Sequence, residues 1–97
     1  MDKAYKIVQA FCQQVTFNGT TSTASTDTLK YSDVVLYATE DCYVAFGVSA
    51  PAATKTGNGN IFIPAGTFFE LVTYPGDYVA CIGAIGAGNL IVYPVTN

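Results

Sequence analysis

Few side chains of this 97-residue sequence could do chemistry, and histidine is not among them. Without histidine, neither a Ser/His/Asp nor a Cys/His arrangement for nucleophilic catalysis is possible. Glu40 and Asp41 are adjacent on a predicted turn, so their carboxylates point apart. Together with Asp77 they could bind calcium if their turns converged, but we interpret them as solvated turn acids. The sequence therefore predicts no catalytic residue and no metal ligand, and we expect that the protein is not an enzyme.

The glycine-rich stretch GAIGAGN at residues 83–89 is the only segment that suggests a nucleotide site. Phosphate-binding loops of this kind open a helix, whereas this stretch lies between two strand-like runs. We therefore expect no cofactor.

The three cysteines, Cys12, Cys42 and Cys81, are widely spaced and form no CxxC pair. With no histidine to complete a ligand set, this is not a zinc-site pattern. We predict that Cys42 and Cys81 are reduced and buried, with Cys12 less determined, and one disulfide with a leftover thiol is the alternative. Glutamines break the apolar part of MDKAYKIVQAFCQQ, so no signal peptide is expected. Reduced thiols fit a protein made in a reducing cytoplasm.

The chain is unusually poor in charge: 11% of its residues are charged and 51% are hydrophobic, whereas an average soluble domain is about 25% charged. Only four residues are basic, and they are dispersed. This pattern predicts no nucleic-acid binding and no binding to anionic lipid. A chain with so little charge either enters a membrane or covers much of its surface with partners.

The elements that position these side chains are predicted to be strands. Apolar residues alternate with period two over residues 34–38 and 42–48, and short strands are expected at residues 61–63 and 68–74. Pro75 and Gly76 occupy the positions that a type II turn requires. Residues 4–15 fit a strand or a helix, with the strand favoured by the β-rich remainder. The fold class predicted is one all-β domain over residues 1–97, an antiparallel β-sandwich of seven or eight strands, jelly-roll or immunoglobulin-like.

Residues 78–97 carry no charge and are just long enough to span a bilayer as a helix. The glycines, Asn89 and Pro94 all weaken a helix, and no basic residue flanks the stretch. Gly88-Asn89 is a hairpin turn signal between strand-like runs at residues 78–85 and 90–95. We therefore predict two strands and no membrane segment.

Residues 39–97 resemble a family of short structural proteins of tailed bacteriophages. The resemblance lies in DCYVAFG at residues 41–47, IPAG at residues 63–66 and PGD at residues 75–77. It implies a virion component without catalysis: a capsid decoration (cement) protein, made in the host cytoplasm, that binds the major capsid protein or other virion proteins on the capsid surface. The alternative is a head-fibre or tail-fibre module that binds a host receptor or glycan, with Tyr31, Tyr43 and Tyr74 stacking on sugar rings.

A contact surface is predicted because a sandwich of this size has one core and covers one face of each strand. Leaving the other face of strand 78–85 open would expose an apolar patch, which a lone soluble protein rarely tolerates. We therefore expect a homo-oligomer, a dimer or a trimer, that also seats on a capsid shell. The Ser/Thr-rich segment 16–33 is predicted to be a loop or an arm that reaches a neighbouring chain. The predicted interface residues are Thr20, Thr21, Ser22, Tyr31, Tyr78 and Ile82.

Overall fold

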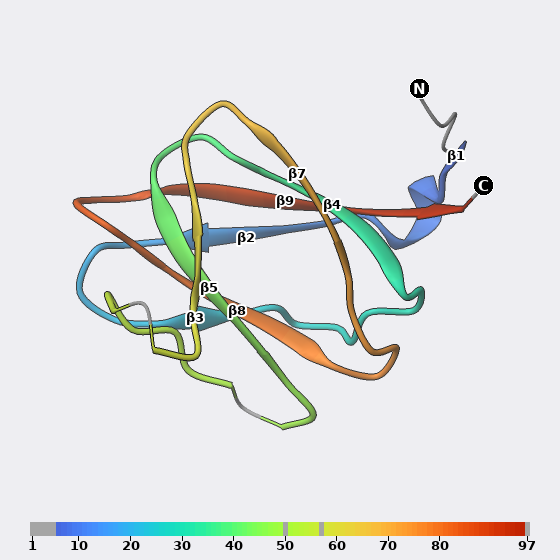
Figure 1. The fold of residues 1–97 in the computed structure, drawn as a ribbon, viewed down its shortest axis with the longest axis horizontal. Coiled ribbons are helices and arrows are strands. Elements are labelled where there is room, and N and C mark those ends of the chain that lie inside the picture. The colour runs from blue at the N-terminus through green and yellow to red at the C-terminus, as the bar shows by residue number, and fades with distance from the viewer. Residues whose placement is uncertain (1–5, 50, 57, 97) are drawn as a thin grey trace.

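The computed structural model describes residues 6–49, 51–56 and 58–96, and these form a β-sandwich (Figure 1). The expected all-β fold with two antiparallel sheets is confirmed. The structure adds one 3-10 helix, η1 (Gln9–Phe11), and has more strands than the seven or eight expected, because two of them are only two residues long. The strands are β1 (Lys6–Ile7), β2 (Gln13–Phe17), β3 (Thr23–Ala24), β4 (Asp33–Ala38), β5 (Cys42–Gly47), β6 (Ile61–Ile63), β7 (Phe68–Val72), β8 (Tyr78–Gly83) and β9 (Gly88–Thr96).

The strand order is that of a jelly roll. Sheet 1 has the order β2-β9-β4-β7, with β1 also pairing with β9, and sheet 2 has the order β3-β8-β5-β6. Between β2 and β9 the chain crosses from one sheet to the other at every connection except the one between β5 and β6. This double Greek-key winding distinguishes the jelly roll from the immunoglobulin-like alternative.

The core lies between the two sheets and follows the period of two that the sequence shows. In β4, the residues Val34, Leu36 and Ala38 are buried, and their neighbours in the strand are half-buried. Leu36 packs with the fully buried Phe17 of β2 in the same core. The whole buried cluster comprises Val15, Phe17, Leu29, Val34, Leu36, Ala38, Cys42, Val44, Ile63, Val79, Cys81, Leu90 and Val92.

The strand favoured for residues 4–15 is confirmed only at the two ends of the described part, β1 and the start of β2, because η1 lies between them; residues 4 and 5 lie outside the described residues. Ile7 pairs with Val95 and Gln13 pairs with Val92, so residues 8–12 lie opposite only Tyr93 and Pro94. The extra residues leave the sheet as η1, and the amide of Val8 donates to the carbonyl of Pro94 at 2.8 Å. Proline lacks the N–H that would donate on this side, so it is tolerated in a central strand where the neighbouring strand bulges away.

Two turn predictions had different outcomes. Gly76 has a φ of 98°, and the amide of Asp77 donates to the carbonyl of Tyr74, which confirms the turn at Pro75-Gly76. The hairpin turn at Gly88-Asn89 is wrong, because β9 already begins at Gly88 and pairs with a different sheet from β8. A side chain at Gly88 would place its Cβ 2.8 Å from the ring of Phe17, so this glycine allows close packing.

Most of residues 16–33 lies outside the strands, as the predicted loop does, but the segment is held against its own chain rather than extended as an arm. Its first two residues belong to β2, and β3 pairs with β8 in sheet 2. Leu29 is buried in the core, and its amide donates to the carbonyl of Asp77 at 2.7 Å. At the start of the connection, the side-chain oxygen of Asn18 accepts hydrogen bonds from the backbone amides of Thr20 and Thr21. Local turns and strand pairing therefore order this Ser/Thr-rich segment within its own chain.

Part of the outer face of sheet 2 is covered by the protein itself, although Phe62 of β6 is 44% exposed. Ala53, in the connection between β5 and β6, is buried with Ala45, Ala80 and Ile82 in a second apolar cluster. The amide of Ala53 donates to the hydroxyl of Ser22 at 2.9 Å and so ties this connection to the sheet. The prediction that another chain must cover the second face of strand 78–85 is therefore wrong for Ala80 and Ile82, which this connection buries. Strands β8 (Tyr78–Gly83) and β9 (Gly88–Thr96) occupy most of the uncharged stretch, and no helix in the described part of the chain is long and apolar enough to cross a membrane.

Candidate functional site

The cysteines occupy the places predicted for them. Cys42 and Cys81 are free thiols that are fully buried in the core between the sheets, and Cys12 is a half-buried free thiol. Burial, together with the smaller effect of the nearby Asp41 charge, raises the pKa of Cys42 from its usual 9.0 to about 12. Burial, with Cys42 as a neighbour, likewise raises the pKa of Cys81 to about 12. Thiols in this state are poor nucleophiles and pack as small apolar side chains.

The three acids that could have bound calcium, Glu40, Asp41 and Asp77, lie in different structural surroundings. Asp41 accepts a hydrogen bond from the amide of Ala65 at 2.8 Å and so holds the turn between β6 and β7. Asp77 is buried, so describing it as a solvated turn acid is wrong, whereas Glu40 is exposed as expected. Within residues 6–49, 51–56 and 58–96, no three acidic or cysteine side chains gather in a way that could hold a metal ion.

The surface that stands out is the outer face of sheet 1. Because Val34, Leu36 and Ala38 point into the core, the alternate residues of β4 point outward. The strand register then places the matching side chains of β7 and β9 on the same outward side. We define the outer face of sheet 1 by these residues together with the neighbouring end of β1: Ile7, Asp33, Val35, Tyr37, Phe68, Glu70, Val72, Ile91, Tyr93 and Val95.

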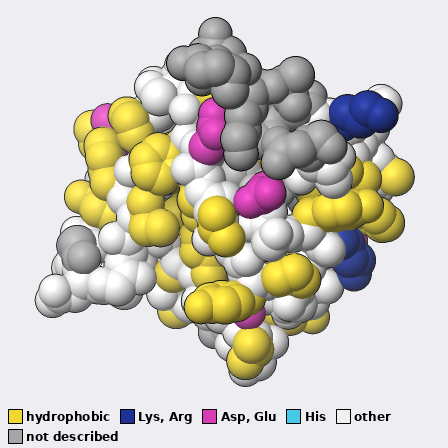
Figure 2. Space-filling view, turned by 45° about the vertical axis from the view of Figure 1, so that its right-hand side comes forward, with side chains coloured by type: hydrophobic (Ala, Val, Ile, Leu, Met, Phe, Trp, Pro, Cys, Tyr) yellow, Lys and Arg dark blue, Asp and Glu magenta, His cyan; other side chains and the backbone are white. Residues whose placement is uncertain are grey.

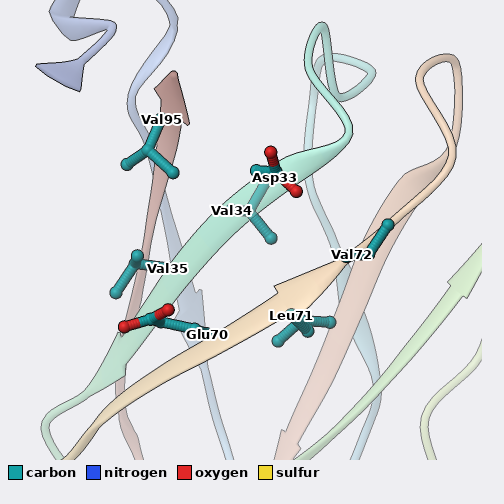
Figure 3. Close-up of a pocket in the computed structure, with 7 residues that line it drawn as sticks. All are labelled: Asp33, Val34, Val35, Glu70, Leu71, Val72 and Val95. Carbon is teal, nitrogen blue, oxygen red and sulfur yellow. The ribbon is translucent and has the colours of Figure 1, made fainter. Parts of the chain in front are cut away.

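Two shallow hollows adjoin on this face and share Val35 and Val95. One, of about 200 Å³, extends between β4 and β7 past Glu70 and Val72. Figure 3 shows Val35 and Glu70 side by side on these two strands, with Val95 near the end of β9. The other hollow, of about 300 Å³, is lined only by Ile7, Val35, Phe68, Tyr93 and Val95. Hollows this small and open suit individual side chains of a partner better than an enclosed small molecule.

The described residues that define this face are mostly apolar and aromatic, and the charged ones among them are acidic. The rings of the cross-strand partners Tyr37 and Phe68 lie with their centroids 4.9 Å apart. Phe68 and Tyr93 are on strands separated by β4, and their rings lie 6.4 Å apart. Asp33 and Glu70 are the two charged residues that the register places here. In the view of Figure 2, hydrophobic side chains form several patches, and basic side chains appear only near the right margin.

The residues predicted for an interface do not lie together on this face. Thr20 and Thr21 are exposed, at the connection that follows β2, while Ser22 binds the amide of Ala53. Tyr31 is half-buried and contacts the ring of Phe11, with 6.1 Å between centroids. Tyr78, at the start of β8, is also half-buried. Ile82 is only 7% exposed, because the connection that carries Ala53 covers it.

Sequence reasoning missed the outer face of sheet 1. In the segment FFELVTY both alternating sets contain large apolar residues, so apolar alternation alone does not say which set faces the core. Glu70 is the signal that could have decided it, because a charged side chain belongs on the solvent side and places Phe68 and Val72 there with it. Phe69 and Leu71 indeed pack against the core.

Comparison of this chain with known protein families, with curated proteins and with solved structures finds no match to any of them. The resemblance to tailed-phage structural proteins thus remains a prediction that depends on the sequence motifs.

Proposed function

We propose that this protein is a non-enzymatic structural component of a bacteriophage virion, a decoration protein that binds the outer capsid surface and stabilises the shell. Its partner would be the major capsid protein or another virion protein, and its site of synthesis the host cytoplasm. The outer face of sheet 1 is the observation that carries this proposal. Jelly rolls also serve as lectin and enzyme-type domains, so the fold alone does not choose the function.

The physical support is the apolar area that this face leaves in water. Phe68 is 65% exposed, which for a side chain of roughly 200 Å² amounts to about 130 Å². Removing that area from water contributes about 3 kcal/mol to binding before association costs. Val72 and Ile7 are large exposed apolar residues on the same face. Contiguous exposed apolar side chains of this kind mark contact surfaces on soluble proteins.

The test uses heads that lack this protein and two matched substitutions. Ile7→Asp places a charge on the outer face of sheet 1, and Ile85→Asp places the same charge on the exposed turn between β8 and β9. We expect the wild type and Ile85→Asp to co-sediment equally with heads, and Ile7→Asp to bind roughly 10-fold more weakly. Wild-type protein that does not bind heads at all would contradict the proposed function, while equal binding by both variants would contradict only the choice of face.

A second candidate is a head-fibre or tail-fibre module that binds a host-surface glycan. The observation that favours it is the aromatic group Tyr37, Phe68 and Tyr93 beside the carboxylate of Glu70, since sugars stack on aromatic rings and donate to carboxylates. Of the tyrosines first considered, Tyr43 packs on Phe62, with centroids 5.3 Å apart, and Tyr74 is exposed. An image of particles labelled on this protein separates the two, because many copies over the shell indicate decoration and a few copies on a fibre indicate receptor binding.

A further inference from the structure

The sequence contains two Asn-Gly pairs, and the structure holds them in opposite ways. Asn18-Gly19 directly follows β2, and Asn58-Gly59 lies in the connection between β5 and β6. In such a pair the backbone nitrogen of the glycine can attack the side-chain carbonyl carbon of the asparagine, because glycine has no Cβ to obstruct the approach. Asparagine is for such reasons a thermolabile residue. Both asparagines are exposed, so exposure alone does not distinguish the two pairs.

The first pair is fixed at its side chain and at its backbone. The Oδ1 atom of Asn18 accepts hydrogen bonds from the amides of Thr20 and Thr21 at 2.9 and 2.8 Å. The main-chain carbonyl of Asn18 accepts another from the amide of Gly83 at 2.8 Å. A Cβ on Gly19 would lie 2.7 Å from a backbone oxygen of the turn between β8 and β9, so the chain packs closely there. Attack by the Gly19 nitrogen would have to break these contacts.

The second pair lacks these restraints. Gly59 has a φ of 71°, and a Cβ placed on it would meet no atom within 4 Å in the described part of the chain. The hydrogen bonds of Asn58 to other described residues involve only its backbone: its amide donates to the hydroxyl of Thr56 at 3.4 Å, and its carbonyl accepts from the side chain of Asn60 at 2.8 Å. The side-chain amide of Asn58 can therefore turn toward the Gly59 nitrogen without breaking a hydrogen bond to these residues.

We propose that Asn58 is a site of spontaneous deamidation through a succinimide. Hydroxide removes the amide proton of Gly59, whose nitrogen then forms a bond to Cγ of Asn58. The Cγ–Nδ2 bond breaks, and the leaving nitrogen takes a proton from water and departs as ammonia. A second water opens the ring, at Cγ to give aspartate or at the main-chain carbonyl carbon to give isoaspartate. Nothing is oxidised or reduced, and either product adds one negative charge to the formal net charge of −3.

The place of Asn58 lets the fold tolerate this change. Asn60 closes the base of the loop, because its Oδ1 accepts from the amide of Thr54 at 3.1 Å and its Nδ2 donates to the hydroxyl of Thr54 at 2.8 Å. Ala53, directly before this closure, stays bonded to Ser22 and buried against sheet 2. Asn58 lies in the loop beyond the closure. We therefore expect the modified protein to stay folded and to carry a more acidic connection between β5 and β6.

The test is incubation of the isolated protein in mildly alkaline buffer, followed by trypsin digestion and mass spectrometry, and it is independent of the proposed function. Cleavage after the lysines separates Asn18, in residues 7–30, from Asn58, in residues 56–97. We expect Asn58 to convert roughly 10- to 100-fold faster than Asn18 in the folded protein, the factor that breaking two hydrogen bonds imposes on the barrier. In urea both sites should convert at similar rates. Circular dichroism of the aged protein should match that of fresh protein.

Asn58→Gln is the matched control, because its longer side chain would have to close a six-membered ring, which forms far more slowly. This variant should lose the fast reaction in residues 56–97 and leave the rate at Asn18 unchanged. Aspartate and isoaspartate should both appear at position 58. An intact Asn58, or equal rates at Asn58 and Asn18 in the folded protein, would overturn the proposal. So would aspartate without isoaspartate, which indicates direct hydrolysis, or the same excess rate at Asn58 in urea, which would assign it to neighbouring residues rather than to the fold.

Discussion

The two buried thiols should make the fold lose stability at alkaline pH. In the folded protein, burial raises the pKa values of Cys42 and Cys81 to about 12, from the usual 9.0 that we expect in the unfolded chain. Below pH 9.0 both states keep these protons, and the contribution of the two thiols to stability is fully present. Between pH 9.0 and about pH 12 only the unfolded chain releases them, so rising pH favours unfolding.

The size of the effect follows from the shift in pKa. Each buried thiol costs up to about 1.4 kcal/mol of unfolding free energy per pH unit in that window. Two thiols together should lower the free energy of unfolding by about 2–4 kcal/mol between pH 9.0 and roughly pH 10.5, the lower value allowing for local solvent access. A domain of this size is stable by only about 5–15 kcal/mol, so the loss is large enough to measure.

The assay is urea unfolding under reducing conditions at a series of pH values, for the protein and for the Cys42→Ala/Cys81→Ala double variant. The double variant should be less stable at neutral pH because of its cavities, but its stability should fall less steeply above pH 9.0. All other side chains are the same in both proteins, so the difference between the two slopes isolates the thiols. Equal slopes would refute the reasoning, and so would rapid labelling of Cys42 and Cys81 by a thiol reagent in the native protein.

Three further substitutions test the packing. Ile82→Asp should lower the free energy of unfolding by about 3–5 kcal/mol, because it buries a charge in the apolar cluster that Ile82 forms with Ala53. Ile85→Asp, on the exposed turn, should change the free energy of unfolding by less than about 0.5 kcal/mol. Equal denaturation midpoints for the two variants would contradict the burial of Ile82 in this cluster. Gly83→Ala should cost about 1–3 kcal/mol in thermal unfolding, since its Cβ would collide with the carbonyl of Gly86, and an unchanged melting temperature would contradict that contact. Asn18→Ala should cost about 1 kcal/mol by removing the acceptor of two backbone amides, and faster amide hydrogen exchange there would be the direct sign.

The sequence predicted local structure correctly where a pattern of side chains is compatible with only one backbone conformation. Alternation in β4 (Asp33–Ala38) identified the strand, and the structure shows that Val34, Leu36 and Ala38 form its buried face. Pro75 and Gly76 fixed their turn, because only glycine readily adopts the positive φ of its second central position. The low charge also predicted burial of apolar surface, and Cys42 and Cys81 lie in the core as their apolar neighbours indicated.

Only the tertiary structure decided which surfaces remain open. Strand propensity does not say which sheet a strand joins, and the crossings between sheets removed the hairpin expected at Gly88-Asn89. The argument from a single core also failed, because a connection carrying Ala53 folds over Ile82 and covers it without help from a partner. Conversely, β7 became the exposed edge because of its place at the end of sheet 1, which no local pattern encodes. Such contacts join residues far apart in the chain, so their existence depends on the winding of the whole jelly roll, whereas strands and turns depend on neighbours in sequence.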